Sequence, residues 1–257
     1  MIDNEKLASK ESLIHRINPC VRILIAVILS FWVALINDFS DFKFLLGCLF
    51  ISFIFVFLAS ITIAEIYQRL KPLFLFLLMI WALLPITFNG DTIYQVLCFD
   101  LSKQGLEYCA MLTIKSITII LFFMAFVATM TIGVMGKALQ KLHISNKFVF
   151  LVLMTYRYIF VIGEEYQRLL RAAKIRGFVS KTNIHSYKTY AHIAGMLFVR
   201  AAMRAKRVHQ AMVCRGFNGR FYTIDKFVMD KLSIIFFIAV LFFMIIYQWL
   251  FIKGLIF

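Results

Sequence analysis

Proline, glycine and acidic residues are all scarce in this sequence of 257 residues. It contains three Pro and 11 Gly, too few for a low-complexity or collagen-like chain. None of its five cysteines forms a C-x-x-C pair, so the sequence has neither a zinc ribbon nor a thioredoxin-like motif. The G-x-x-x-x-G-K-[ST] loop is also absent, and we therefore do not expect the chain itself to bind ATP.

Apolar residues dominate the composition. They make up 62% of the chain, with 29 Phe among them, and the mean hydropathy is +0.87. A soluble domain is about 45–50% apolar, whereas a bilayer can cover apolar surface that a core of this size cannot bury. The composition therefore predicts a membrane protein built as one compact unit.

Five apolar segments are each expected to cross the membrane as a helix, because lipid offers no partners for open backbone groups. They cover about residues 21–36, 44–63, 73–88, 111–134 and 232–252. The first is short for a bilayer core that needs about 20 residues, and Arg22 is expected to snorkel and lengthen it. Pro72 is expected to begin the third segment, where a missing N–H costs nothing. Lys115 is expected to snorkel to the outer interface.

Charges alternate in sign along the loops that join these segments. Basic residues precede the first segment and lie between the second and third, whereas acidic residues lie in the other two loops. The basic residues are Lys6, Lys10, Arg16, Arg22, Arg69 and Lys71, and the acidic residues are Asp38, Asp41, Asp91, Asp100 and Glu107. Because cytoplasmic loops collect Lys and Arg, the pattern predicts five spans with the N-terminus inside and the C-terminus outside.

Residues 136–231 form one large basic region. It holds 18 Lys and Arg against four acidic residues, which is +14 of the total charge of +15. Such a region is expected in the cytoplasm. We therefore divide the chain into 1–135 with four spans, 136–231 as a cytoplasmic region of two to three helices, and 232–257 with the last span. The expected fold class is an all-α polytopic membrane protein.

Two long helices are predicted in this basic region. The first covers about residues 148–176 and the second about 186–214, and Gly177 and Gly216 are natural stops for them. Arg157 interrupts the apolar half of the first helix, and a charge in the middle of a span is expensive. We interpret this half as interfacial or packed on other helices, with a sixth span as the alternative.

The second half of the first helix is expected to face solvent. Glu164 and Arg168 stand four residues apart, a spacing at which opposite charges pair on a helix surface. Lys206, Arg207 and Arg215 give the second helix a basic end.

The two predicted helices end in the same pattern, Ala-x-x-x-Arg-Gly-Phe. The copies lie 39 residues apart and consist of Ala172, Arg176, Gly177 and Phe178, and of Ala211, Arg215, Gly216 and Phe217. Alanine lies on the same face as arginine and keeps the helix tip thin. Arginine offers a forked cation to a carboxylate, glycine turns the chain away, and phenylalanine provides an apolar anchor. One copy alone is explained by the helix dipole, but two copies favour binding to two equivalent partners, such as an ATPase dimer.

These residues resemble the transmembrane T component of energy-coupling factor transporters, the EcfT/CbiQ family. That family carries two Ala-Arg-Gly motifs at the ends of cytoplasmic coupling helices. The matching residues here are Ile175-Arg176-Gly177 and Cys214-Arg215-Gly216, so the alanine directly before arginine is replaced in both copies. The run Asn18-Pro19-Cys20-Val21-Arg22 is similar to the Asp-Pro-Arg-x-Lys segment of the family. The resemblance covers essentially the whole chain.

Two further stretches resemble the cobalt and nickel branch of the family. They are Tyr156–Phe160 with Glu164 and Glu165, and Arg215–Phe221. The resemblance implies a non-catalytic subunit that binds two cytosolic ATPases through Arg176 and Arg215, together with a separate substrate-binding membrane subunit, the S component. It implies uptake of cobalt or nickel across the bacterial inner membrane, with vitamin uptake as the alternative.

No cofactor or metal site is expected in this chain. Its histidines are His15, His143, His185, His192 and His209, all outside the predicted spans, and none pairs with another at i,i+4. A zinc-like site needs at least three convergent ligands, although His185 and His192 can share a helix face. An integral membrane enzyme and a protein whose basic loop binds anionic lipid are the alternatives from other classes. Nucleic-acid binding fits the charge, but no recognisable module is present.

Overall fold

The structure, a computed structural model of the chain, divides into two compact units. It describes residues 14, 17–36, 42–87, 92–96, 99–217 and 231–252. The first unit is Met1–Ala138 with Phe227–Phe257, and the second is Leu139–Lys226. The expectation of one compact unit is therefore wrong. Composition is an average over the whole chain, so it does not show that the polar and basic segment Leu139–Lys226 forms a unit of its own.

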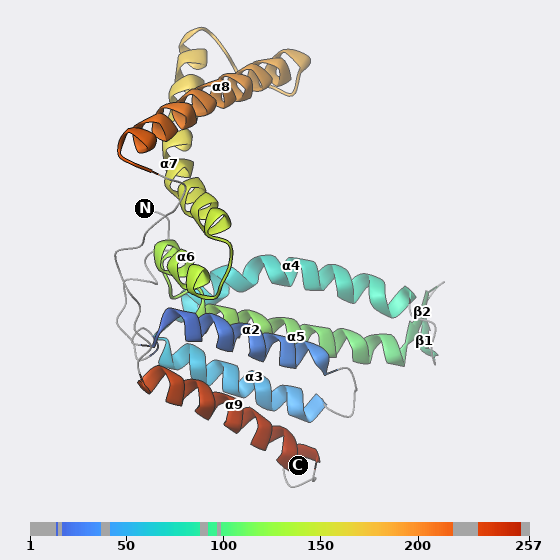
Figure 1. Cartoon of the computed structure of the whole chain (residues 1–257). Coiled ribbons are helices and arrows are strands. Elements are labelled where there is room, and N and C mark those ends of the chain that lie inside the picture. The colour runs from blue at the N-terminus through green and yellow to red at the C-terminus, as the bar shows by residue number, and fades with distance from the viewer. Residues whose placement is uncertain are drawn as a thin grey trace. The chain divides into compact units, whose positions relative to one another are not determined.

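The first unit is a bundle of apolar helices. They are α2 (Pro19–Leu35), α3 (Phe42–Leu58), α4 (Ile63–Thr87), α5 (Lys103–Phe126) and α9 (Lys231–Ile252), and α6 (Ile132–Lys141) follows α5. Successive helices from α2 to α5 alternate in direction (Figure 1). A short antiparallel pair, β1 (Thr92–Val96) and β2 (Phe99–Ser102), joins α4 to α5. The all-α fold class is confirmed, with this hairpin as a small addition that the sequence did not indicate.

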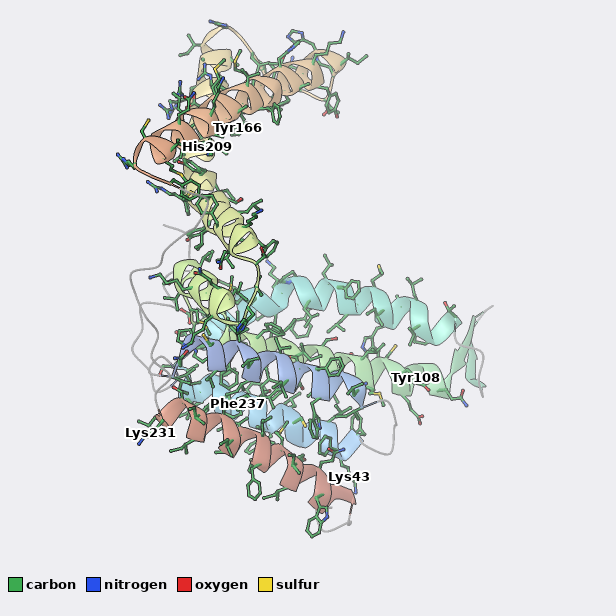
Figure 2. The ribbon with its side chains drawn as sticks, in the orientation of Figure 1. Lys43, Tyr108, Tyr166, His209, Lys231 and Phe237 are labelled. Atoms are coloured by element: carbon green, nitrogen blue, oxygen red, sulfur yellow. The ribbon has the colours of Figure 1, made fainter. Side chains whose placement is uncertain are left out.

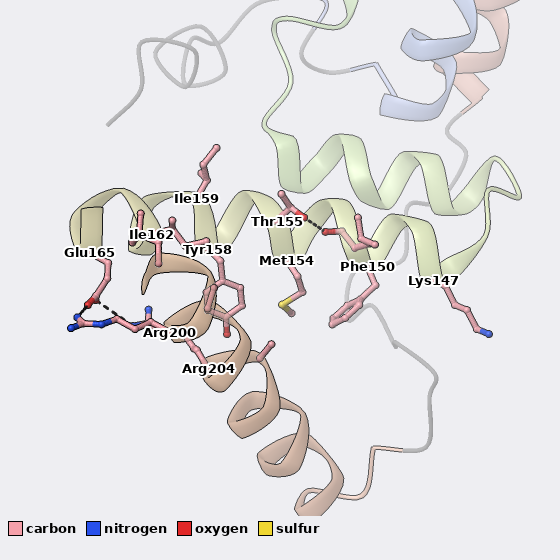
Figure 3. Close-up of a pocket in the computed structure, with 14 residues that line it drawn as sticks. Lys147, Phe150, Met154, Thr155, Tyr158, Ile159, Ile162, Glu165, Arg200 and Arg204 are labelled. Carbon is pink, nitrogen blue, oxygen red and sulfur yellow. Dashed lines mark hydrogen bonds and ion pairs between the residues drawn. The ribbon is translucent and has the colours of Figure 1, made fainter. Parts of the chain in front are cut away.

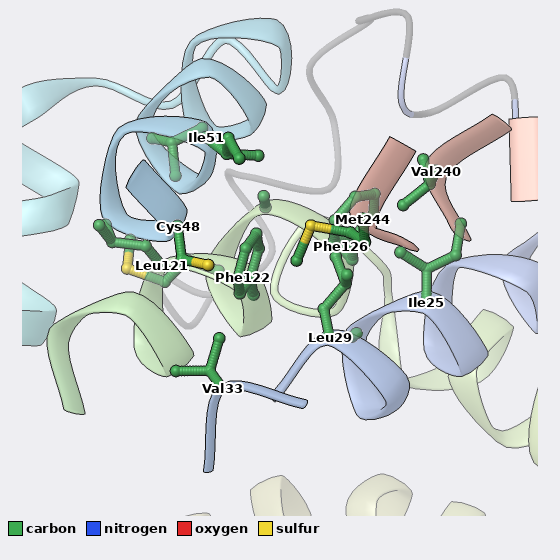
Figure 4. Packing of buried hydrophobic residues seen from close by; sticks show 14 of the residues in the cluster. Ile25, Leu29, Val33, Cys48, Ile51, Leu121, Phe122, Phe126, Val240 and Met244 are labelled. Atoms are coloured by element: carbon green, nitrogen blue, oxygen red, sulfur yellow. The ribbon is translucent and has the colours of Figure 1, made fainter. Parts of the chain in front are cut away.

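The core of this unit lies around α5, which packs against α2, α3 and α4. Phe122 and Phe126 of α5 are fully buried, and the ring of Phe55 on α3 packs against both of them, 5.1 Å from the Phe126 ring. Ile25 and Leu29 of α2 and Met244 of α9 close the same cluster (Figure 4). Lys43 and Lys231, at the starts of α3 and α9, lie at opposite ends of the bundle (Figure 2), so these two helices run antiparallel.

Three of the described helices are long and apolar enough to cross a membrane. They contain Ile63–Pro85, Gln104–Phe126 and Lys231–Trp249. The apolar helices α2 and α3 are shorter, with 17 residues each. All five coincide in order with the five predicted spans, although several boundaries differ.

The boundary between the second and third spans is wrong in the sequence analysis. The second helix ends at Leu58 and the third begins at Ile63, so Pro72 lies inside α4 and does not begin it. The cause is local, because signals close to residue 60 end α3 and begin α4. Ser60 has a positive φ of 55°, and the Glu65 carboxylate accepts a hydrogen bond from the Thr62 N–H at 2.9 Å. Thr62 and Glu65 have capping-box spacing, which begins a helix regardless of its hydropathy.

The fourth span is shifted toward the N-terminus. Helix α5 begins at Lys103 and ends at Phe126, whereas the prediction was 111–134. Hydropathy places the polar first turn of α5 in the loop before the span, but helical hydrogen bonds do not require apolar side chains, and the helix begins at Lys103. The chain turns after Phe126, and the Thr131 hydroxyl accepts the Val134 N–H at 3.3 Å to start α6.

Two cations expected to snorkel are buried. Arg22 is 3% exposed, and its guanidinium donates to the Thr129 hydroxyl, in the turn after α5. Lys115 is 8% exposed, and its ammonium donates to the Ala34 carbonyl at 3.4 Å. Ala34 lies in the last turn of α2, where carbonyls lack partners within the helix. Each cation therefore meets an acceptor inside the bundle that the sequence could not indicate.

The second unit consists mainly of two long helices. They are α7 (Asn146–Ile175) and α8 (Ile184–Cys214), which confirms both predictions to within two residues. Several charged residues used to infer the topology lie outside the described residues. They are Lys6, Lys10, Arg16, Asp38, Asp41, Asp91, Asp225 and Asp230.

Candidate functional site

The two repeated helix ends have the same backbone structure. We call residues 172–178 the first helix end and residues 211–217 the second. Arg176 and Arg215 are the C-cap residues, with φ, ψ of −82°, 14° and −92°, 13°. Gly177 and Gly216 follow in the left-handed region, with φ of 87° and 80°. The predicted glycine stops are confirmed, because this conformation strains residues that have a Cβ.

Each end is closed by the same pair of backbone hydrogen bonds. Gly177 N–H donates to the Lys174 carbonyl at 3.0 Å, and Phe178 N–H donates to Ala173 at 3.1 Å. At the second end Gly216 donates to Val213 at 2.9 Å and Phe217 donates to Met212 at 3.0 Å. These are the two bonds of a Schellman motif, which satisfies the last carbonyls of a helix. The repeat in sequence is thus a repeat in structure.

The side chains of the two ends also share one pattern of exposure. At both ends the alanine, the arginine and the glycine are exposed, and the phenylalanine is half-buried. The residues directly before the arginines, Ile175 and Cys214, are exposed as well. Each end therefore presents a cation on a thin, accessible helix tip.

The first end borders a groove between α7 and α8. The groove has a volume of about 550 Å³, and Ala172, Arg176 and Phe178 line it together with His185 and His192 of α8. The expectation that these two histidines share a helix face is confirmed. Within the part of the chain that the structure describes, no group of three or more His, Cys, Asp or Glu residues could hold a metal ion.

The chain after the first end folds back onto α8. Phe178 makes an edge-to-face contact with Tyr190, with ring centroids 5.5 Å apart. The Tyr190 hydroxyl also hydrogen-bonds Ser180 at 2.9 Å. Asn183 caps α8 by accepting the Ser186 N–H at 2.9 Å. The first end is thus held in place by its own chain, whereas residues 218–221 after the second end lie outside the described residues.

A second groove between α7 and α8 is largely apolar. It has a volume of about 520 Å³ and is lined by Phe150, Met154 and Ile162 of α7 and Leu197 of α8 (Figure 3). Leu151 and Ile159, also in its lining, are 60% and 55% exposed. Although α7 carries this apolar face, it is not among the described helices apolar enough to cross a membrane.

One end of this groove carries a charge cluster that sequence analysis missed. The Glu165 side chain is only 12% exposed and pairs with three arginines, Arg168 of its own helix and Arg200 and Arg204 of α8. The hydrogen bond from Arg200, with the charges of Arg168 and Arg204, lowers the pKa of Glu165 despite the opposing effect of partial burial. The predicted Glu164–Arg168 pair is present but long, at 4.0 Å.

Comparison with known proteins matches nearly the whole chain to one family. The profile of the CbiQ family, described as cobalt transport protein, matches residues 10–223. The chain is 25% identical over 244 residues to the energy-coupling factor transporter transmembrane protein EcfT of Macrococcus caseolyticus, covering 88% of this chain and 90% of that protein. It is 24% identical to EcfT of Brevibacillus brevis, covering 81% and 82%. EcfT of Bacillus subtilis is 25% identical over similar shares.

Proposed function

The chain belongs to the CbiQ family, and we propose that it is the transmembrane coupling subunit of an energy-coupling factor importer. Its similarity to EcfT proteins extends over more than four-fifths of its length, at 81% or more in each case. In this proposal the chain is not an enzyme. Two cytosolic ATPase subunits hydrolyse ATP, and a separate membrane subunit binds the substrate.

The observation that carries the proposal is the pair of matched helix ends. Arg176 and Arg215 are exposed, stand at equivalent positions of two Schellman motifs, and are followed by glycines that remove the chain from the tip. An exposed guanidinium on a thin tip can enter a groove and form a bidentate contact with a carboxylate. Two such tips on one chain fit two copies of one partner.

The proposed mechanism follows from the connection of these tips to long rigid helices. ATP binding closes the two ATPases, and the closure displaces the tips that they hold. Helices of 30 and 31 residues carry that displacement along their length to the substrate-binding subunit, which reorients. ATP binding and substrate release are then coupled through two states of the assembly, and neither ATP nor substrate needs to bind this chain.

We further propose that the substrate is a cobalt or nickel ion, held by the partner subunit and not by this chain. The family description supports a metal substrate. The names of the EcfT relatives specify no substrate, and vitamin uptake by the same architecture is the second candidate. Uptake of radioactive cobalt by cells that express the chain with its natural neighbours separates the two.

The proposed location is the bacterial inner membrane, with the N-terminus and the basic region in the cytoplasm and the C-terminus outside. The concentration of positive charge in residues 136–231 supports this orientation. The alternating directions of α2 to α5 support an even number of crossings between Pro19 and Phe126.

Co-purification tests the proposed function. The tagged chain is expressed with its neighbours, solubilised, and assayed for retained ATPase subunits. Replacing both Arg176 and Arg215 by glutamate is expected to abolish retention. The matched control replaces Arg171 and Arg207 by glutamate. These are exposed arginines of the same helices outside the motifs, and the control is expected to retain the ATPases. If a well-folded native chain retains no ATPase, the coupling function is wrong.

Lysine substitutions distinguish a groove contact from binding to anionic lipid. Arg176→Lys with Arg215→Lys keeps the charge but removes the forked geometry. We expect it to reduce ATPase retention while leaving binding to vesicles of anionic phospholipid unchanged. Equal retention by the lysine variant would show that positive charge alone is enough for the contact with the ATPases, and it would overturn the forked groove contact.

A further inference from the structure

The cluster around Glu165 is placed symmetrically with respect to the two helix ends. The repeat that relates the ends has an offset of 39 residues, and the same offset relates Glu165 to Arg204. These two residues therefore occupy equivalent positions in the two copies. They carry opposite charges and lie in contact, with a distance of 3.7 Å between the Arg204 guanidinium and the Glu165 carboxylate.

Equal spacing to the motif arginines follows from this register. Glu165 lies 11 residues before Arg176, and Arg204 lies 11 residues before Arg215. Both intervals are helical throughout, since α7 continues to Ile175 and α8 to Cys214. At 1.5 Å per residue, each tip lies about 16.5 Å along its helix from the point where the two helices pair.

The two helices meet at this point through charged side chains, next to a groove that apolar side chains do not fill. The apolar groove opens beside the cluster, and Glu165, Arg200 and Arg204 form part of its lining (Figure 3). Arg200 donates to the Glu165 carboxylate from the facing helix, and Arg168 approaches it at 3.4 Å from the same helix. Without the carboxylate, the three guanidinium groups would repel one another, and only the long contact of 4.0 Å between Arg168 and Glu164 would offset that repulsion.

We propose that Glu165 is a positioning residue whose pairing with Arg200 and Arg204 fixes the point at which α7 and α8 cross, so that the two motif arginines are presented at equal distances from it. The role given to this pairing rests on the proposed coupling function, whereas the crossing of α7 and α8 can be measured in this chain alone. An ATPase dimer is symmetric, and symmetric presentation lets both subunits engage together. Sliding of one helix would move one tip out of register.

The effect is expected in geometry more than in stability, because partly exposed ion pairs contribute little to the free energy of unfolding. Spin labels at Cys214 and at a cysteine introduced by Ile175→Cys report the distance between the tips. These two positions are also equivalent in the repeat, and both are exposed. Cys98 is replaced by serine, and the other three cysteines are buried. The measurement uses the full chain in detergent, without ATPase.

Glu165→Gln is expected to widen the distance distribution by an amount comparable to one helical turn, about 5.4 Å. The matched control is Glu164→Gln, which removes the same charge from the adjacent residue, whose side chain is 77% exposed. The control is expected to keep the native distribution. Equal distributions for both variants would overturn the proposal.

A charge exchange keeps the test decisive if Glu165→Gln fails to fold. Glu165→Arg combined with Arg204→Glu moves the acid to the equivalent position on α8, where Arg200 and Arg207 stand four residues before and three residues after it. We expect this variant to restore a narrow distribution, and a distribution as broad as that of Glu165→Arg alone would contradict the proposal. Retention of the ATPases by the native chain is measured in parallel. If the native chain retains no ATPase, the coupling function is wrong, and the distance measurement still tests the role of Glu165 in the arrangement of α7 and α8.

Discussion

The Tyr247 side chain of α9 occupies the space that a side chain at Gly47 of α3 would need. A Cβ at Gly47 would lie 1.6 Å from the Tyr247 hydroxyl oxygen and 2.6 Å from the carbon that bears it. The Tyr247 ring also stacks on Phe44 with centroids 4.8 Å apart. Small residues allow close approach of helices in membranes, and here a single glycine admits a tyrosine from a segment about 200 residues away.

Gly47→Ala is therefore expected to destabilise the bundle. The added methyl overlaps Tyr247, and overpacking of this kind costs about 1–3 kcal/mol. Thermal unfolding of the purified protein in detergent should show a lower midpoint. Gly163→Ala on α7 is the control, because nothing lies within 4 Å of a Cβ there and alanine favours a helix. Adding Tyr247→Phe should recover part of the loss, and no recovery would mean that the contact is not the cause.

Thr129→Val is expected to destabilise the first unit through Arg22. The Thr129 hydroxyl accepts from the buried Arg22 guanidinium and donates to the Ala125 carbonyl at 2.9 Å. Valine keeps the shape but leaves a buried donor without its acceptor, which costs about 1–3 kcal/mol.

Thr118→Val provides the comparison for this substitution. Thr118 is also fully buried on α5, and its hydroxyl donates only to the Ile114 carbonyl one turn earlier. Its loss is expected to be small, since that carbonyl is also the usual acceptor of the helix backbone. Unfolding midpoints that fall equally in the two variants would show that Arg22 does not depend on Thr129.

Alanine at Gly177 and Gly216 is expected to reduce ATPase retention. Both glycines have left-handed backbones, which cost other residues roughly 1–2 kcal/mol. The helices would relax toward continuing past the arginines and would lose the thin tip. Co-purification measures the effect, and Gly195→Ala within α8 is the control, with open space around its Cβ. Retention equal to that of the control would show that the turn is not needed.

The arrangement of α7 and α8 is expected to withstand mild acid. The pKa of Glu165 is lowered in the folded protein, so its contribution is present above the unfolded pKa of about 4.3 and is lost only as the pH falls through the lower folded value. The distance between labels at positions 175 and 214 should stay constant from about pH 7 to about pH 5. A change in this window that disappears in Glu165→Gln would place the folded pKa above its ordinary value and contradict the assignment.

Local features of this protein could be read from the sequence because they depend on neighbouring residues. Gly177 and Gly216 stop their helices where predicted, since a left-handed turn after an amphipathic run requires glycine. The five apolar segments stand in the predicted order, because hydropathy alone selects residues for lipid. The Thr62–Glu65 capping box is equally local, and it could have placed the start of α4 correctly.

Long-range partners were decided only by the tertiary structure. Arg22 and Lys115 were expected to reach toward the interface, but Thr129 and Ala34 offer them acceptors inside the bundle. Whether a charged side chain reaches water or a buried acceptor depends on which helices pack against it. The sequence of a single segment does not specify those neighbouring helices. The repeat of 39 residues was visible in the sequence, whereas the meeting of Glu165 and Arg204 at equivalent positions required α7 and α8 to cross at that point.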